Sequence, residues 1–156
     1  KEDDMANDQN QDKEFNGNAY NFELMDVDGN VHKLADYAGK KVYIKFWATW
    51  CSICLSGMSE FIEFDEAHKD DEDVIVLTVV APNTNGEMNK EKFKSWYVSQ
   101  NLMFNVLLDE NGDVMREYGI RGFPTSVVID TNGNVSENKI GHVDNQTIES
   151  ILMKTQ

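Results

Sequence analysis

Two cysteines, Cys51 and Cys54, are the residues with the clearest capacity for chemistry in this chain of 156 residues. They follow the strand-like segment 42–47, and their spacing places them one turn apart on a helix that would begin at Cys51. Unpaired N–H groups and the helix dipole stabilise a thiolate at such a start. We therefore expect Cys51 to be the attacking thiolate and Cys54, further in and more hidden, to be the resolving thiol.

Three other interpretations compete with this one. A zinc site needs about four ligands, whereas the chain offers two cysteines and three scattered histidines, His32, His68 and His142, so we predict no metal. A structural disulfide across two residues would close almost no loop and would remove little unfolded-state entropy. An inert pair of buried thiols is the third alternative, and a strand-to-helix junction is an unusual place for it.

The elements that must position these cysteines alternate between strand and helix. Apolar and β-branched runs predict strands at 22–25, 31–34, 42–47, 74–80, 104–108, 126–130 and 135–140. Helical spacing predicts a helix over 55–69, a second that begins near Asn89, and a third that Asp144 or Asn145 caps. The first two strands and the last two should form hairpins around Asp-Gly and Asn-Gly turns. This order indicates an α/β sandwich with a mixed central sheet.

Composition limits the function further. The net charge of −14 makes nucleic acid a poor partner, and no apolar run approaches the ~20 residues of a membrane span. Residues 1–14 hold six acids and two lysines, so we predict a disordered acidic tail or tether followed by one domain at 15–156. Because the chain starts at Lys1, we interpret it as a processed or trimmed product.

Two motifs resemble those of a known family. Phe46-Trp47-Ala48-Thr49-Trp50-Cys51-x-x-Cys54 resembles the active-site signature of the thioredoxin superfamily, and Gly119-Ile120-Arg121-Gly122-Phe123-Pro124-Thr125 resembles its cis-proline loop. The leading hairpin is similar to that of the TlpA- and ResA-like branch, and the chain most resembles extracellular thioredoxin-like lipoproteins of Gram-positive bacteria. The resemblance spans residues 15–156 and implies a thioredoxin-like sandwich, a mixed central sheet flanked by helices, with an N-terminal β-hairpin extension.

The resemblance also implies a site. A cis peptide at Phe123–Pro124 would place its loop beside the cysteines, where the loop backbone would pair with an extended substrate segment. Trp50 would cover one side of the cysteine pair and Phe123 the other. Gly141 and His142 would lie in a loop that faces the site. No metal and no organic cofactor would be needed.

Two positions depart from the family pattern. Ser52-Ile53 stands where the best-known members have Gly-Pro. Lys45 stands where thioredoxins keep a buried carboxylate, and since a lysine is costly to bury we expect its side chain to reach a sheet edge. A cation there would favour thiolates and make the cysteine couple more oxidising. Glu60, the nearest acid on the following helix, receives no catalytic role.

The function implied is thiol-disulfide exchange with a protein disulfide. The resemblance implies a surface methionine sulfoxide reductase as partner, a membrane electron donor of the CcdA type, and lipid anchoring at the outer face of the cell membrane. We expect a monomer. Three alternatives stay open: an oxidase that delivers its disulfide to secreted proteins, a reductase of apocytochrome c thiols, and a surface binding module with an incidental disulfide.

Overall fold

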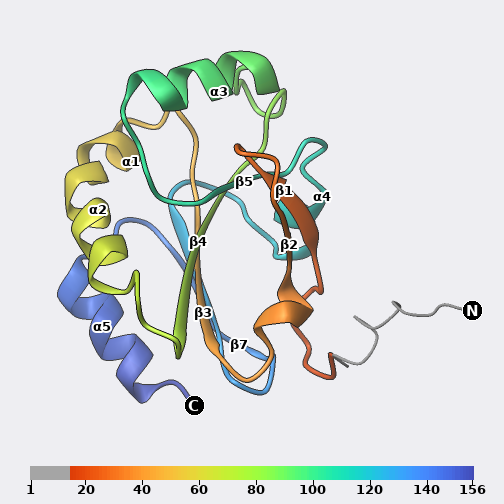
Figure 1. Cartoon of the computed structure of the whole chain (residues 1–156), viewed down its shortest axis with the longest axis vertical. Helices are drawn as coiled ribbons and strands as arrows, with labels where there is room; N and C mark the ends of the chain where they lie inside the picture. Colours follow the sequence, from red (N-terminus) through yellow and green to blue (C-terminus); the bar gives the residue numbers. More distant parts are fainter. Residues whose placement is uncertain (1–14) are drawn as a thin grey trace, which may run out of the picture.

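A seven-stranded mixed sheet runs through the middle of the protein, with helices packed on both of its faces (Figure 1). The computed structural model describes residues 15–156, so the predicted acidic tail at 1–14 lies outside the described residues. The strand order is β2-β1-β5-β4-β3-β6-β7, with β3 and β4 parallel and β4 and β5 parallel. The predicted thioredoxin-like α/β class is confirmed.

The strands agree closely with those expected from the sequence. They are β1 Glu23–Asp26, β2 Val31–Lys33, β3 Lys41–Phe46, β4 Val74–Val80, β5 Val106–Leu108, β6 Thr125–Ile129 and β7 Val135–Ile140. The helices are η2 Leu34–Tyr37, α1 Ser52–Ser56, α2 Met58–Ala67, α3 Lys90–Ser99, α4 Asp113–Glu117 and α5 Asn145–Lys154. Among the described residues, no helix combines the length and the apolar character that a membrane crossing requires.

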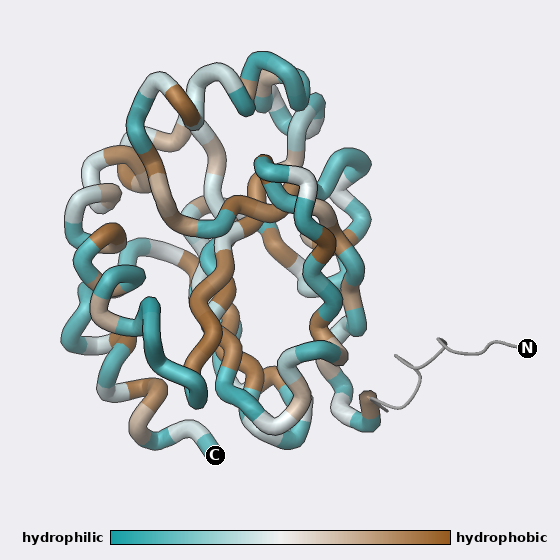
Figure 2. The backbone as a smooth tube through the Cα atoms, in the orientation of Figure 1, coloured by the Kyte–Doolittle hydropathy of each residue, from teal (hydrophilic) through white to brown (hydrophobic). Residues whose placement is uncertain are grey.

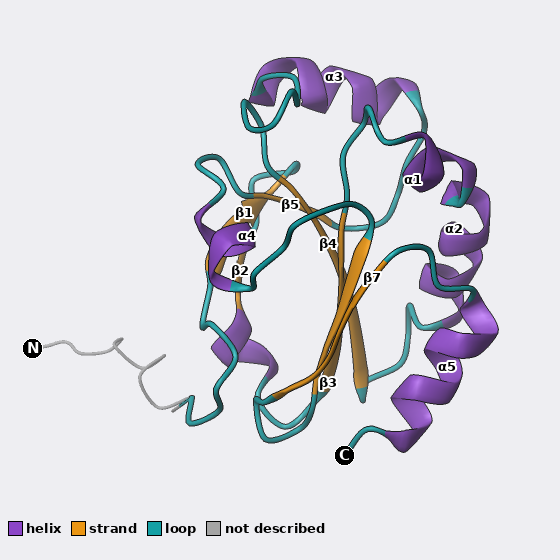
Figure 3. Ribbon diagram, turned by 180° about the vertical axis from the view of Figure 1, so that it is seen from behind, coloured by secondary structure: helices purple, strands orange, loops and turns teal. Residues whose placement is uncertain are grey.

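Alternation along β3 divides the core into two apolar clusters. Tyr43 packs with residues of α1, α2, α3 and α5 on one face, whereas Val42 and Ile44 pack with residues of η2 and α4 on the other. Figures 1 and 3 show α1, α2 and α5 together on one side of the sheet and α4 on the opposite side. The inner strands are the most hydrophobic stretch of the backbone (Figure 2), as expected for strands covered on both faces.

Sheet topology brings two distant segments to one edge. β3 ends at Phe46, shortly before Cys51, and β6 begins at Thr125, directly after Pro124. Because β6 runs antiparallel to β3 with Phe46 paired to Thr125, the start of β6 lies at the end of β3. The cysteine segment and the proline loop therefore emerge side by side.

One predicted helix is interrupted in the structure. The helix expected to begin at Cys51 is confirmed, since α1 starts at Ser52 with Cys51 as its N-cap. The helix expected over 55–69, whose helical spacing starts with Leu55, is instead interrupted at Gly57, between α1 and α2. Leu55 is 40% exposed. A Cβ at Gly57 would meet the His142 ring at 3.3 Å, so the break lets the loop before α5 approach.

Two short elements were missed, η2 and α4. Four or five residues are too few to show helical periodicity. A side-chain cap from the preceding loop stabilises α4, because the Asp109 carboxylate accepts the N–H groups of Val114 and Met115 at 3.2 and 2.9 Å. Burial raises the pKa of Asp109.

Asp26 organises the N-terminal hairpin. Its carboxylate accepts the N–H groups of Asp28 and Asn30 at 2.8 and 2.9 Å, and it lies 2.7 Å from Nε2 of His32. His32 Nδ1 in turn lies 2.7 Å from the Tyr37 hydroxyl. Burial alone would raise the pKa of Asp26, but the hydrogen bonds from His32 and the turn backbone outweigh it and hold the pKa below its ordinary value.

We expect Asp26→Asn to reduce the free energy of unfolding by about 1–3 kcal/mol at pH 7, since the carboxylate's bond to His32 is lost within a buried network. A lowered pKa in the folded state gives stability that is present above the ordinary pKa and is lost as the pH falls through the folded value. The difference from the parent should therefore shrink below about pH 4. Urea unfolding at pH 7 and pH 3 measures it.

Asp28→Asn is the matched control, because Asp28 is exposed in the same turn and only its backbone N–H bonds to Asp26. It should leave stability nearly unchanged. An Asp26→Asn deficit of equal size at both pH values would contradict the assignment.

Candidate active site

The two cysteines share one hydrogen bond at the start of α1. Cys51 is the N-cap residue, and its Sγ accepts the N–H of Cys54 at 3.2 Å. Both are free thiols, with Cys51 6% and Cys54 1% exposed. The sulfur of Cys51 thus lies at the positive end of the helix with the second thiol behind it, an arrangement suited to attack by the first and resolution by the second.

The proline loop reaches the first cysteine. The Phe123–Pro124 peptide is cis, as expected, and the Phe123 carbonyl oxygen lies 3.6 Å from the Cys51 Sγ, close enough to accept its S–H. Gly141 N–H donates to the Pro124 carbonyl at 2.7 Å, so the next loop runs alongside. A polypeptide joined to Cys51 would therefore meet the Phe123 backbone at once.

Trp50 and Phe123 form one aromatic wall. We expected the rings on opposite sides of the cysteine pair, but the structure brings them into edge-to-face contact with centroids 5.8 Å apart. Trp50 is 55% exposed, and Ile53 of α1 is equally exposed. Apolar side chains thus stand open to solvent around the buried sulfurs.

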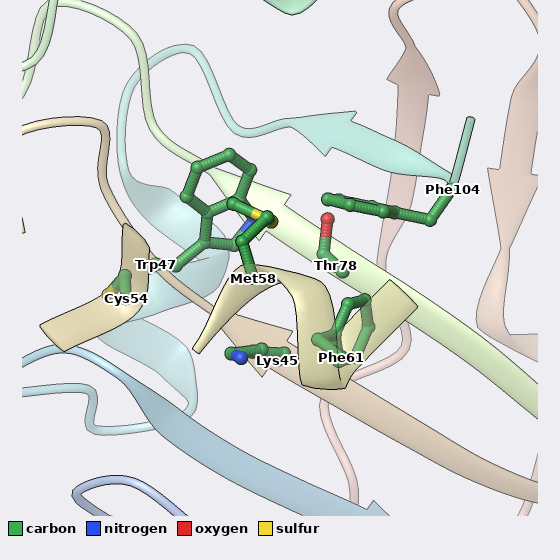
Figure 4. Close-up of a pocket in the computed structure, with 7 residues that line it drawn as sticks. All are labelled: Lys45, Trp47, Cys54, Met58, Phe61, Thr78 and Phe104. Carbon is green, nitrogen blue, oxygen red and sulfur yellow. The ribbon is translucent and has the colours of Figure 1, made fainter. Parts of the chain in front are cut away.

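Lys45 lies under the cysteines rather than at a sheet edge. Its strand, β3, is flanked by β4 and β6, so no edge is within reach, and the expectation that its side chain would leave the sheet is wrong. Its ammonium lies 4.6 Å from the centroid of the Phe61 ring. Figure 4 shows Lys45 and Cys54 lining the same tightly packed space beneath α1 and α2, with Trp47, Met58, Phe61, Thr78 and Phe104 around it.

Lys45 and Cys54 each offset part of the effect of burial on the other's pKa. Burial raises the pKa of the Cys54 thiol well above its ordinary value, the Cys51 sulfur raises it further, and the charge of Lys45 lowers it. Burial lowers the pKa of Lys45, while the cysteines and Glu60 favour its charged form. Lys45 is therefore the cation placed to stabilise the Cys54 thiolate when it forms.

Glu87 is a residue that the sequence interpretation missed. It is 7% exposed, and its carboxylate accepts the N–H and the hydroxyl of Thr49 at 2.8 and 2.7 Å and the N–H of Met88 at 3.1 Å. It thereby holds the segment two residues before Cys51. No sequence signal marks it, because its partner lies 38 positions away.

Glu60 and His142 anchor the neighbouring loop. Glu60 accepts the N–H of Asn145 at 2.9 Å and lies 3.4 Å from His142 Nε2. The His142 ring lies against Gly57, between α1 and α2. Both side chains are partly exposed to solvent (38% for Glu60, 42% for His142). They link the cysteine helix to the start of α5, and within residues 15–156 neither has a hydrogen bond to a sulfur.

Acidic turns elsewhere bind backbone. Asp130 accepts the N–H groups of Asn132 and Asn134, both at 2.9 Å, as Asp26 does in the first hairpin. Within residues 15–156, no three His, Cys, Asp or Glu side chains are placed to hold a metal ion. The chemistry at hand is that of the two sulfurs.

Comparisons with known proteins find relatives of one kind. A model of the Redoxin family matches residues 11–152. The thiol-disulfide oxidoreductase ResA of Geobacillus thermodenitrificans is 32% identical over 135 residues, which cover 86% of this chain and 74% of the relative. The exposed lipoprotein thioredoxin Etrx1 of Streptococcus pneumoniae is 40% identical with a TM-score of 0.79, over 86% of this chain and 99% of that one. StoA of Bacillus subtilis is 27% identical with a TM-score of 0.74, over 86% and 98%.

We expect Lys45→Met to slow resolution by Cys54. Cys54 must lose its proton before it attacks, and since burial keeps its pKa high, the parent's resolution rate should rise with pH. Without the ammonium, the pH profile of the resolution rate should move to higher pH. The rate at pH 7 should then fall on the order of ten-fold, which corresponds to one pKa unit. The reduction potential should become more negative, because the reduced thiolate form loses a stabilising charge. Single-turnover kinetics and equilibration with glutathione measure the two effects.

Lys41→Met is the matched control. Lys41 begins the same strand, but its ammonium donates to the Leu152 carbonyl at 2.7 Å, at the opposite end of the sheet. It should leave the pH profile and the potential unchanged. An unaltered profile in Lys45→Met would dismiss the electrostatic role of Lys45.

Proposed function

Because this chain belongs to the Redoxin family and to the TlpA- and ResA-like branch of the thioredoxin superfamily, and is thus a thiol-disulfide oxidoreductase, we propose that it reduces disulfides of exported proteins with Cys51 and Cys54 as its catalytic residues. Phe123, Pro124 and Trp50 form the surface that receives the substrate. The observation that carries this proposal is the Cys51 sulfur at the start of α1, beside the Phe123 carbonyl and backed by Cys54.

The reaction balances in two exchanges. The Cys51 thiolate attacks one sulfur of the partner disulfide; the partner's S–S bond breaks, its other sulfur leaves as a thiolate and a mixed disulfide forms. Cys54, once deprotonated, attacks the Cys51 sulfur and releases the partner's second thiolate. The partner gains two electrons, and the enzyme is left with a Cys51–Cys54 disulfide that an electron donor must reduce again.

We further propose that the partner is a methionine sulfoxide reductase at the cell surface, and that a membrane protein of the CcdA type returns the electrons. The similarity to an exposed pneumococcal lipoprotein thioredoxin supports a place outside the cytoplasm, and we extend it to lipid anchoring at the outer face of the membrane. The protein acts as a monomer in this proposal.

A second candidate, the delivery of disulfides to secreted proteins, is favoured by one observation. Lys45 beneath the pair stabilises thiolates and hence the reduced form, which makes the couple a stronger oxidant. The reduction potential separates the two functions. A value near about −120 mV fits an oxidase, and a value well below about −200 mV fits a reductase.

We expect Cys54→Ala to accumulate a mixed disulfide with its partner, because attack by Cys51 still occurs and resolution does not. Incubation with a bacterial surface extract, followed by mass spectrometry of the covalent species, should identify a methionine sulfoxide reductase. Cys51→Ala should trap nothing and should not reduce insulin.

Each outcome bears on a separate part of the proposal. A trapped species that contains other proteins but no such reductase would remove that partner and leave the reaction intact. A parent protein that fails to reduce insulin, or a Cys51→Ala variant that reduces it as well as the parent, would instead favour a binding module.

A further inference from the structure

Both arginines of the chain face the same hollow beside the cysteines. Arg116 and Arg121 are the only arginines in the sequence, and both line a surface hollow of about 380 Å³. We call this the arginine hollow and define it by Trp50, Thr84, Asn85, Arg116, Arg121 and Phe123. Within residues 15–156, no Asp or Glu side chain is among the residues that line it. In a chain with a net charge of −14, this hollow is a local site of positive charge, although Asp113 offsets the charge of Arg116, and such a site favours an anionic ligand.

The two arginines differ in how free they are. Arg116 is paired with Asp113 of its own helix, and both side chains are well exposed. Arg121 is exposed, and within residues 15–156 it has no ion-pair partner. The Arg121 guanidinium is therefore available to pair with a ligand. Its planar set of N–H donors matches the two oxygens of a carboxylate.

The arginine hollow shares two lining residues with the surroundings of the reactive sulfur. Trp50 and Phe123 line it, and the same two rings form the aromatic wall beside Cys51. The Phe123 carbonyl lies 3.6 Å from the Cys51 Sγ. The loop that carries Arg121 and Phe123 runs from the end of α4 toward the end of the sheet at which α1 begins (Figure 3). A polypeptide attached to Cys51 that contacts the aromatic wall would therefore also lie next to the arginine hollow.

Glycine keeps part of the hollow open. A Cβ at Gly112 would lie 3.3 Å from both the Arg116 guanidinium and the Thr84 methyl group, and Gly112 has a left-handed φ of +73°. At Gly122, between Arg121 and Phe123, a Cβ would lie 2.9 Å from the terminal methyl of Ile140, so that exposed side chain would have to shift. The absence of a side chain at Gly112 therefore leaves room between Arg116 and Thr84 in the hollow.

We propose that the arginine hollow binds an acidic side chain of the partner polypeptide, an aspartate or glutamate within a few residues of the cysteine that Cys51 attacks. This inference rests on the proposed function and specifies its substrate class. The bound carboxylate pairs with Arg121, while the apolar atoms next to it contact Trp50 and Phe123. The pairing places the partner's sulfur over Cys51 and selects disulfides with acidic flanks.

The test compares two synthetic peptides, each with one cysteine joined to thionitrobenzoate. They are identical except for Glu or Gln on both sides of the cysteine. When the Cys51 thiolate attacks the peptide sulfur, thionitrobenzoate leaves as a coloured thiolate and Cys51 keeps the peptide, so absorbance reports the attack. At low salt we expect the parent to react roughly three-fold faster with the Glu peptide, as an exposed charge pair allows. Net charge alone would favour the Gln peptide.

Variants separate Arg121 from net charge. In Arg121→Gln the Glu-to-Gln rate ratio should fall to one or below, and Arg121→Lys should keep a ratio above one. Lys154→Gln removes one positive charge from the exposed end of α5 and should keep the parent ratio. High salt should bring the parent ratio close to one, because it screens exposed charges.

The outcomes are distinguishable. If the parent reacts with both peptides at equal rates, or if Lys154→Gln lowers the ratio as much as Arg121→Gln does, the hollow does not select acidic segments although the exchange reaction stands. If the parent reacts with neither peptide, the proposed function fails and this inference fails with it.

Discussion

The hydrogen bond from the Cys54 N–H to the Cys51 sulfur sets the order of events at this site. It makes the first cysteine the cap of α1, so that its sulfur lies where the N–H groups of the helix are unpaired. The same geometry fixes Cys54 one turn inside, where burial disfavours its thiolate. One sulfur is thereby prepared to attack, and the other becomes reactive only when its proton can leave. The break at Gly57 and the brace from Glu87 to Thr49 hold this first turn in place from both sides.

Local signals in the sequence were sufficient for much of this arrangement. Strand content around 42–47, the spacing of the cysteines and the alternation of strands with helices are properties of short segments, and they predict the α/β class. The resemblance to the thioredoxin superfamily is what implies that the Phe123–Pro124 loop lies beside the cysteines, as it does in the structure. The antiparallel pairing of β6 with β3 brings the two segments to one edge of the sheet. The caps of α3 and α5 were likewise readable, because Asn89 and Asp144 bond within three residues of themselves.

What the sequence could not supply depends on contacts between distant residues. Glu87 binds a segment 38 positions away. The interruption at Gly57 reflects the approach of His142. The position of Lys45 was misjudged for a related reason, since strand order decides whether a lysine has an edge to reach, and that order is a property of the whole sheet.

Charge at this site is arranged on two length scales. The acidic surface acts at long range, but salt screens exposed charges beyond roughly 8–10 Å, so a partner close to Cys51 is influenced mainly by nearby groups. Two cations are among them, with Lys45 beneath Cys54 and Arg121 in the hollow that Trp50 and Phe123 also line. The half-buried ammonium of Lys45 influences which sulfur is ionised, because charges that are partly removed from water interact through a lower dielectric. The exposed guanidinium acts on which polypeptide stays in place while exchange occurs. An acidic protein can therefore remain soluble through its overall charge and still attract an acidic substrate segment, because the two effects operate over different distances.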